Sequence, residues 1–175
     1  SPDAVLSDSL RRGRVILGYG LLFDPTRDAP KPCVQHALGL PIIRSAGVQT
    51  DDPFFQATSA VCNIPTLTAA AQASGFLNAA PDPDGILRRA PLLMQYDERV
   101  YPALSLAAVR STSNAQDLVL RVANVNTASL GIAGRDVPLD GKSNLLLRYR
   151  GAKRTFPYIS AVDILQGHVD PAEFH

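Results

Sequence analysis

The chain has 175 residues, which is enough for one domain with a hydrophobic core of its own. Hydrophobic residues make up 46% and charged residues 19% of it, a balance that excludes an intrinsically disordered chain. The formal net charge of +1 gives no electrostatic basis for binding nucleic acid or an anionic membrane surface.

A helix followed by a buried strand is predicted at the start. The segment Ser1-Pro2-Asp3 supplies an N-cap residue, a proline for the first helical position and an acid for the first turn. The helix is expected to end at Gly13. The apolar run over residues 15–22 contains β-branched and aromatic residues, which favours a buried strand. This apolar stretch is far shorter than the roughly 20 residues of a membrane-spanning helix.

The middle of the chain is harder to interpret. Prolines interrupt residues 24–65, so mostly loop with one or two short elements is expected there. Residues 65–75 begin with Pro, end with Gly and are rich in Ala between, which predicts a helix. Residues 76–79 and 86–95 predict two strands, and the turn segment Pro81–Gly85 between them predicts a hairpin.

The second half predicts further elements of both kinds. In order, these are a buried helix over 103–110, strands over 118–122 and 129–132, a turn over 137–141, a strand over 144–149, and a helix over 161–166 capped by Ser160 and closed by Gly167. The expected fold class is mixed α/β: one domain over residues 1–175, three-layer-like, with a central mixed sheet flanked by helices.

No motif for catalysis or metal binding stands out. The histidines are His36, His168 and His175, and no phosphate-binding loop or nucleophile elbow accompanies them. We therefore predict no catalytic residue, no metal ligand and no cofactor. The two cysteines, Cys33 and Cys62, have no metal-ligand pattern. They are either two separate thiols or one disulfide, a choice that the sequence leaves open.

The acidic turn Asp82-Pro83-Asp84-Gly85 allows three interpretations. It contains part of a calcium-loop pattern, but the later acidic ligands of that pattern are absent. It also fits a plain hairpin turn in which Asp side chains accept hydrogen bonds from nearby backbone N–H groups. Finally, Asp84 and Arg88 are placed to form a charge pair that pins the hairpin.

A basic cluster follows the last predicted strand. Arg148 and Arg150 lie two residues apart, so on a strand they would share one face, while Tyr149 would point into the core. Together with Lys153 and Arg154, this face would either bind a carboxylate or phosphate group or simply be solvated.

Several segments in order resemble the CHASE type-2 (CHASE2) family of extracellular sensory domains. Residues 75–92 resemble its Gly-aromatic-x-Asn start, Asp-x-Asp-Gly turn, Arg and Pro-Leu, and residues 101–107 resemble the Leu/Ala helix that follows. Residues 145–151 and 156–167 resemble the final strand and closing helix, and residues 3–10 resemble a helix that precedes a central strand. The resemblance is patchy over 24–64. Members of the family usually have a further N-terminal α/β segment that this chain lacks, so the chain is expected either to be cut from a longer receptor without that segment or to be a short variant of the domain.

The resemblance implies a non-catalytic input domain of a bacterial receptor. It would lie outside the cytoplasmic membrane, periplasmic or at the cell surface, between transmembrane helices, and would regulate a cytoplasmic cyclase, histidine kinase or serine/threonine kinase. Its expected partners are an unknown small ligand, those flanking helices and the output domain. A homodimer is one option, and nucleic acid is not expected. The candidate ligand-facing residues are Asn78, Asp82, Asp84, Arg88, Arg148 and Arg150.

Two alternatives stay open at this point. One is a hydrolase or transferase in which Asp82 or Asp84 and a histidine act as acid and base. The other is a structural or dimerisation domain that binds no ligand. A sizeable, partly polar pocket would count against this last alternative.

Overall fold

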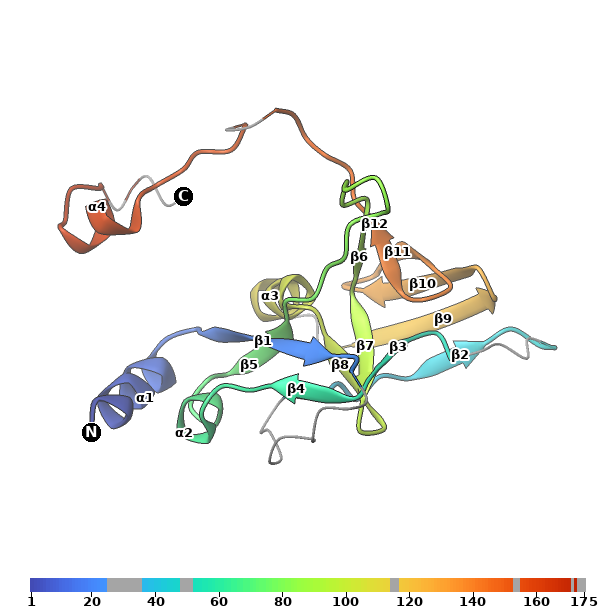
Figure 1. Ribbon diagram of the computed structural model, residues 1–175, viewed down its shortest axis with the longest axis horizontal. Helices are drawn as coiled ribbons and strands as arrows, with labels where there is room; N and C mark the ends of the chain where they lie inside the picture. The colour runs from blue at the N-terminus through green and yellow to red at the C-terminus, as the bar shows by residue number, and fades with distance from the viewer. Residues whose placement is uncertain (25–35, 48–51, 114–116, 153–154, 171, 173–175) are drawn as a thin grey trace.

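The computed structural model of the chain describes residues 1–24, 36–47, 52–113, 117–152, 155–170 and 172 (Figure 1). Its helices are α1 (Pro2–Arg12), α2 (Pro65–Thr68), α3 (Leu104–Ser113) and α4 (Ala161–Leu165). Its strands are β1 (Ile16–Leu22), β2 (Ile42–Arg44), β3 (Phe55–Ala57), β4 (Ser59–Val61), β5 (Ala73–Phe76), β6 (Arg89–Pro91), β7 (Leu93–Tyr96), β8 (Arg99–Pro102), β9 (Leu118–Asn124), β10 (Thr127–Ile132), β11 (Arg135–Asp140) and β12 (Asn144–Leu146). The predicted mixed α/β class is confirmed.

The strands are distributed over four small sheets rather than one central sheet. Three of these sheets are mixed, with the orders β4-β1-β5, β3-β7-β8 and β11-β10-β9-β2, and the fourth is the antiparallel pair β12-β6. The region 24–65, expected to hold one or two short elements, contributes β2, β3 and β4. No helix in the described part of the chain has the length and apolarity needed to cross a membrane.

The predicted opening of the chain is confirmed. The Ser1 side chain accepts a hydrogen bond from the Ala4 N–H at 3.4 Å, Pro2 occupies the first turn of α1 and Gly13 follows its last residue. The α1 helix lies against α2, where the buried Ser7 hydroxyl donates to the Thr66 carbonyl at 3.3 Å.

The predicted helix over 65–75 is too long. Only Pro65–Thr68 is helical, and Ala73–Phe76 forms β5, which pairs in parallel with β1 (Figure 1). Gly75 explains why α3 can cover this strand so closely: a Cβ at this position would lie 2.5 Å from the Cα of Leu104. Tertiary pairing therefore overrides the helix propensity of the alanines.

The predicted hairpin between 76–79 and 86–95 is also wrong, although the turn between them forms. β5 pairs with β1, whereas β6 pairs with β12, so the two segments belong to different sheets. The hairpin of this region lies further on, between β7 and β8. Its turn residues, Asp97 and Glu98, have positive φ angles of 49° and 59°. Because neither residue is a glycine, the sequence does not signal this turn.

The predicted turn over 137–141 is displaced, because 137–140 belong to β11 and the chain turns at Gly141 and Lys142, where the Ser143 N–H donates to the Asp140 carbonyl at 3.1 Å. A further turn, not predicted, lies at Ala133 and Gly134, which have φ angles of 50° and 73°. Pro138 fits within β11 because that strand is an edge of its sheet, where a missing N–H costs little.

Two hydrophobic clusters meet at β7 and α3. Leu93 and Leu106 belong to the cluster under β9–β11, while Met94 and Ala103 belong to the cluster that contains Tyr19 of β1. Successive residues of β7 thus face different clusters, as the period of two for a strand requires. These shared elements join the four small sheets into one body.

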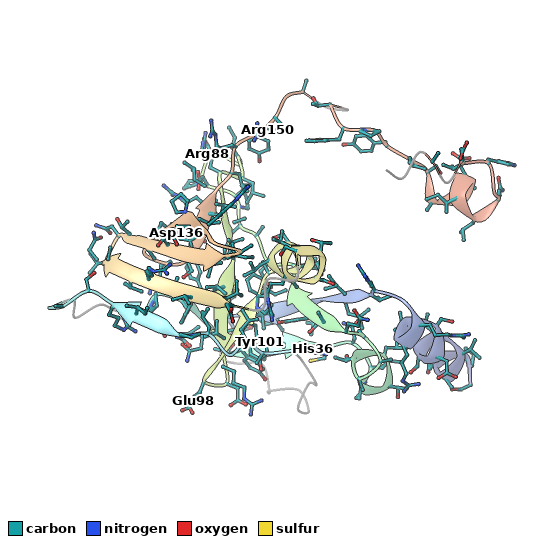
Figure 2. All side chains as sticks on the ribbon, turned by 180° about the vertical axis from the view of Figure 1, so that it is seen from behind. His36, Arg88, Glu98, Tyr101, Asp136 and Arg150 are labelled. Carbon is teal, nitrogen blue, oxygen red and sulfur yellow. The ribbon has the colours of Figure 1, made fainter. Side chains whose placement is uncertain are left out.

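The chain after β12 stands apart from this body in both views (Figures 1 and 2). It ends in α4, which begins at the N-cap Ser160 as predicted and is followed by Gly167 with a φ of +71°. No residue of α4 is buried.

Candidate functional site

The acidic turn is closed by its own backbone. The Gly85 N–H donates to the Asp82 carbonyl at 2.8 Å, and Gly85 has the positive φ of +83° that favours glycine. The Ile86 N–H donates to Oδ1 of Asp84 at 3.1 Å. This matches the turn interpretation, in which an aspartate side chain accepts from the backbone two residues later.

Arg88 binds both carboxylates of the turn. Its Nη1 lies 3.1 Å from Oδ2 of Asp82, and its Nη2 lies 2.7 Å from Oδ2 of Asp84. The Arg88 hydrogen bond, followed by that of Ile86, holds the pKa of Asp84 below its usual range, and the same contact with Asp84 raises the pKa of Arg88. The predicted Asp84–Arg88 pair is confirmed, and Asp82 joins it.

The calcium interpretation finds no support in this geometry. Both carboxylates face a guanidinium, and the described residues contain no group of three or more His, Cys, Asp or Glu side chains arranged to hold a metal ion.

Asn78 lies just after β5 and holds the backbone of β1. Its side-chain oxygen accepts from the Leu21 N–H, and its side-chain nitrogen donates to the Leu21 carbonyl, both at 2.8 Å. The amide therefore continues the β1–β5 pairing beyond the last residue of β5. A ligand contact by Asn78 stays a prediction, and it would have to use lone pairs or hydrogens that these bonds leave free.

Arg148 and Arg150 lie beyond the end of β12 rather than on a strand, and both are exposed. Tyr149 does not point into the core as expected: it is 68% exposed, and its hydroxyl donates to the Leu87 carbonyl at 2.6 Å. Figure 2 shows Arg150 and Arg88 together at one extremity of the molecule. Lys153 and Arg154 lie outside the described residues.

A cavity of about 470 Å³ lies at the carboxyl ends of the parallel strands β1 and β5. Crevices at this end of parallel strands are common ligand sites in α/β proteins. We call it the carboxyl-end cavity. It is lined by residues from separate segments between positions 23 and 144: Phe23, Phe55, Asn78, Ala79, Ala80, Asp82, Arg89, Pro91, Met94 and Asn144.

Apolar side chains dominate the lining of the carboxyl-end cavity. Phe23 and Phe55 are partly exposed there, although large aromatic side chains are usually covered. Among the polar groups, Asn144 donates to Asp140, while the exposed Arg89 reaches Asp140 only at 3.9 Å. The cavity thus offers an apolar interior with one weakly paired cation at its edge. It brings together Asn78 and Asp82 of the predicted set.

A second hollow, of about 490 Å³, lies at the opposite ends of the same strands and is here called the basic cleft. Its polar lining residues are Arg14, His36, Gln72, Ser74, Arg110 and Ser111. They come from four separate parts of the chain and follow no motif, so sequence reasoning singled out only His36 among them. No spacing in the sequence signals this group.

His36 is fixed to the wall of the basic cleft by Ser74. The His36 N–H donates to Oγ of Ser74 at 3.2 Å, and Nδ1 of the ring lies 3.0 Å from the same oxygen. No hydrogen bond joins a histidine to Asp82 or Asp84 in the described part of the chain. The acid–base pair of the enzyme alternative is therefore not assembled there. His168 follows α4, where its N–H donates to the Asp163 carbonyl, and His175 lies outside the described residues.

Cys62 is disulfide-bonded. Cys33, the other cysteine of the sequence, lies outside the described residues.

Among known proteins, a family model described as the CHASE2 domain matches residues 2–175. No curated protein and no solved structure matches the chain.

Proposed function

Because the chain belongs to the CHASE2 family of extracellular sensory domains, we propose that it is the ligand-binding input domain of a bacterial transmembrane receptor. In this proposal it is not itself catalytic. Binding of a small solute would regulate a cytoplasmic cyclase or kinase in the same receptor.

The carboxyl-end cavity is the observation that carries the ligand-binding part of the proposal. At about 470 Å³ it falls within the roughly 300–1,000 Å³ of small-molecule sites, and its apolar walls with a few polar groups match their usual lining. The matching ligand is a small, mainly apolar molecule with an acidic or hydrogen-bond-accepting group that faces Arg89.

The same cavity gives a route for signalling. Its lining includes Phe55 of β3, Pro91 of β6 and Asn144 of β12, which belong to two sheets other than that of β1 and β5. A ligand that prefers one arrangement of these sheets would shift the population toward it. Since β12 leads directly into the segment that ends in α4, a shift of β12 would be passed toward the rest of the receptor.

The disulfide of Cys62 supports the proposed place outside the cytoplasm, because disulfides persist in oxidising compartments and are rare in the cytosol. Flanking transmembrane helices, the output domain and a homodimer belong to the same proposal. None of them bears on whether the cavity binds a ligand.

Thermal unfolding of the chain with a panel of aromatic and branched aliphatic carboxylates tests the proposal. A ligand at 100 times its Kd adds about 2.7 kcal/mol, which raises the melting temperature of a chain of this size by about 5–10 °C. Replacing the exposed Ala80 with Trp fills the cavity, so an Ala80→Trp variant is expected to lose this shift.

Ala123→Trp is the matched control, because Ala123 is also an exposed alanine but lies on β9 outside the cavity. It is expected to keep the full shift. Equal loss of the shift in both variants, or no shift with any member of the panel, would count against a carboxylate ligand in this cavity.

A further inference from the structure

We propose that the basic cleft is a binding site for a small multivalent oxyanion, a molecule that carries carboxylate or phosphate groups. The cleft lies where β1 and β5 begin, between Arg14 and Gln72 on one side and Arg110 on α3 on the other. Its lining shares no residue with the carboxyl-end cavity at the other end of these strands. Anion binding in the basic cleft therefore does not depend on ligand binding in the carboxyl-end cavity.

Charge is the first argument for an anion. The cleft is lined by two arginines, and no acidic side chain is among its lining residues. Four arginines elsewhere in the described chain have a carboxylate within 4.0 Å, namely Arg11, Arg88, Arg89 and Arg121. Neither Arg14 nor Arg110 has such a partner in the described part of the chain. Two guanidinium groups without a counter-charge at one hollow form a suitable environment for an oxyanion.

Arg110 supplies a second argument. Its Nε atom is buried and has no hydrogen-bond partner among the described residues. Arg110 lies in the last turn of α3, where a cation is favoured by the helix dipole, but that interaction leaves the Nε–H without an acceptor. Buried N–H groups are nearly always paired in folded proteins. An oxygen atom bound in the cleft would provide the missing acceptor once the Arg110 side chain turns this N–H toward it.

The His36–Ser74 contact orients the His36 ring, a third hydrogen-bonding group of the cleft beside Arg14 and Arg110. Ser74 is only 1% exposed, and its oxygen already accepts the His36 N–H, so its own hydrogen is free to be donated to Nδ1. In the tautomer in which Ser74 donates to Nδ1, the ring hydrogen of His36 is on Nε2. No described residue accepts from Nε2. In this tautomer His36 offers a hydrogen-bond donor to the cleft, and Figure 2 labels His36 in the lower part of the body.

The remaining polar groups suit the same ligand. The Gln72 amide and the Ser111 hydroxyl also line the cleft, and both are able to donate to an oxyanion oxygen. A volume of about 490 Å³ accommodates an anion with several atoms beyond one charged group. Carboxylate and phosphate groups share the chemistry that this lining recognises, so the two sources have to be separated by experiment.

Isothermal titration calorimetry of the whole chain with succinate and with inorganic phosphate, at constant ionic strength, is the test. Saturable binding of at least one of them at one site per chain is expected. Binding of succinate alone identifies a dicarboxylate ligand, and binding of phosphate alone identifies a phosphate group. Arg110→Gln and Arg14→Gln are each expected to weaken binding about tenfold or more, since each removes a charge-assisted hydrogen bond.

Arg135→Gln is the matched control, because it removes the same charge from an exposed position on β11 outside the cleft. It is expected to leave the affinity within about twofold, as a surface charge far from the site does. Melting temperatures of all variants show whether each remains folded. The His36 ring signal in NMR spectra provides an independent measurement, and it is expected to move on addition of the anion while that of His168 does not.

Two results would overturn the inference. One is the absence of saturable binding by both anions together with an unmoved His36 signal. The other is an equal loss of affinity in Arg135→Gln and Arg110→Gln, which would show that binding reflects net charge alone.

Discussion

Arg88 binds two carboxylates with one side chain, and all three groups come from a stretch of seven residues. The four-residue spacing of Asp84 and Arg88 made this pair predictable, because the turn between them fixes where both side chains point. The pair stabilises a local loop rather than a distant contact. Its contribution to the stability of the whole domain is therefore expected to be small at neutral pH. It should show more clearly as a change in stability with pH.

The lowered pKa of Asp84 predicts the direction of that pH dependence. A carboxyl group whose pKa is lower in the folded protein adds stability above its unfolded pKa, near 4, and this stability is lost as the pH falls through the folded value. Asp84→Asn is expected to melt slightly below the unmodified chain at pH 7. The difference should shrink as the pH falls below the unfolded pKa and disappear once Asp84 is protonated in the folded chain as well, when both chains carry a neutral side chain there.

Thermal melts of both chains from pH 7 to pH 2.5 measure this effect. Asp117→Asn is the control, because Asp117 is exposed and has no ion pair in the described structure. Its difference from the unmodified chain is expected to be small and independent of pH. A constant Asp84→Asn difference over the same range would contradict the proposed cause.

The hydrogen bonds of Asn78 could not be predicted from the local sequence. Its position in a family-like motif marked it as notable, but its hydrogen-bond partner Leu21 is 57 residues away in the sequence. No local pattern signals that the amide continues the pairing of two strands. Contacts of this kind become visible only once β1 and β5 are known to be neighbours.

At the scale of elements, the first and last helices were predictable because their signals are local. Ser1, Pro2 and Ser160 act on the backbone within three residues of themselves. β5 was misassigned for the opposite reason: its alanine, serine and glycine do not favour a strand, and only pairing with β1 makes it one. The true turns at 97–98 and 133–134 were missed because three of their four residues adopt positive φ without being glycine.

Packing of α3 on β5 gives a sharp prediction at Gly75. An added Cβ would lie 2.5 Å from the Leu104 Cα and 2.6 Å from its N, and backbone atoms of a packed helix have little room to move. Gly75→Ala is expected to lower the free energy of unfolding by about 3 kcal/mol, or the melting temperature by about 6–12 °C. Chemical and thermal denaturation both measure it.

Gly39→Ala is the matched control for this substitution. No atom lies within 4 Å of a Cβ added at Gly39, and this glycine does not have a positive φ. The change is expected to stay within about 0.5 kcal/mol of zero, or to stabilise slightly by restricting the unfolded chain. If Gly75→Ala were equally mild, α3 would have to be less tightly packed on β5 than the structure shows.

On the scale of the whole molecule, both hollows depend on topology more than on composition. The basic cleft gathers Arg14, His36 and Arg110 from three distant parts of the chain, and the carboxyl-end cavity joins residues from Phe23 to Asn144. The segment around Asn78 and Asp82 was marked in advance because it is locally distinctive, and His36 only as one of the three histidines. A sequence without a catalytic or metal motif therefore predicts the fold class more readily than it predicts which side chains line the same hollow.

The segment after β12 gives the last prediction. It exposes large apolar side chains, including Phe156, Tyr158 and Leu165, and no side chain of α4 is buried. Near its start it is held to the body by the Leu147 N–H, which donates to the Arg88 carbonyl, and by the Tyr149 hydroxyl, which donates to the Leu87 carbonyl. A chain that ends at Ala152 keeps both bonds and loses almost no buried surface, so it should melt within about 2 °C of the full chain.

Thermal melts of the two chains test this directly, and limited proteolysis adds an independent measure. Cleavage of the full chain is expected first between Thr155 and Ser160, because proteases act on exposed backbone with few tertiary contacts. The carboxyl-end cavity should bind ligand equally well in both chains, because none of its lining residues follows Asn144. A drop of several degrees in the shorter chain would mean that the exposed apolar side chains pack on the body in solution. The segment after β12 would then stabilise the body by covering part of it. It could not move separately from the body to transmit a shift of β12 to the rest of the receptor.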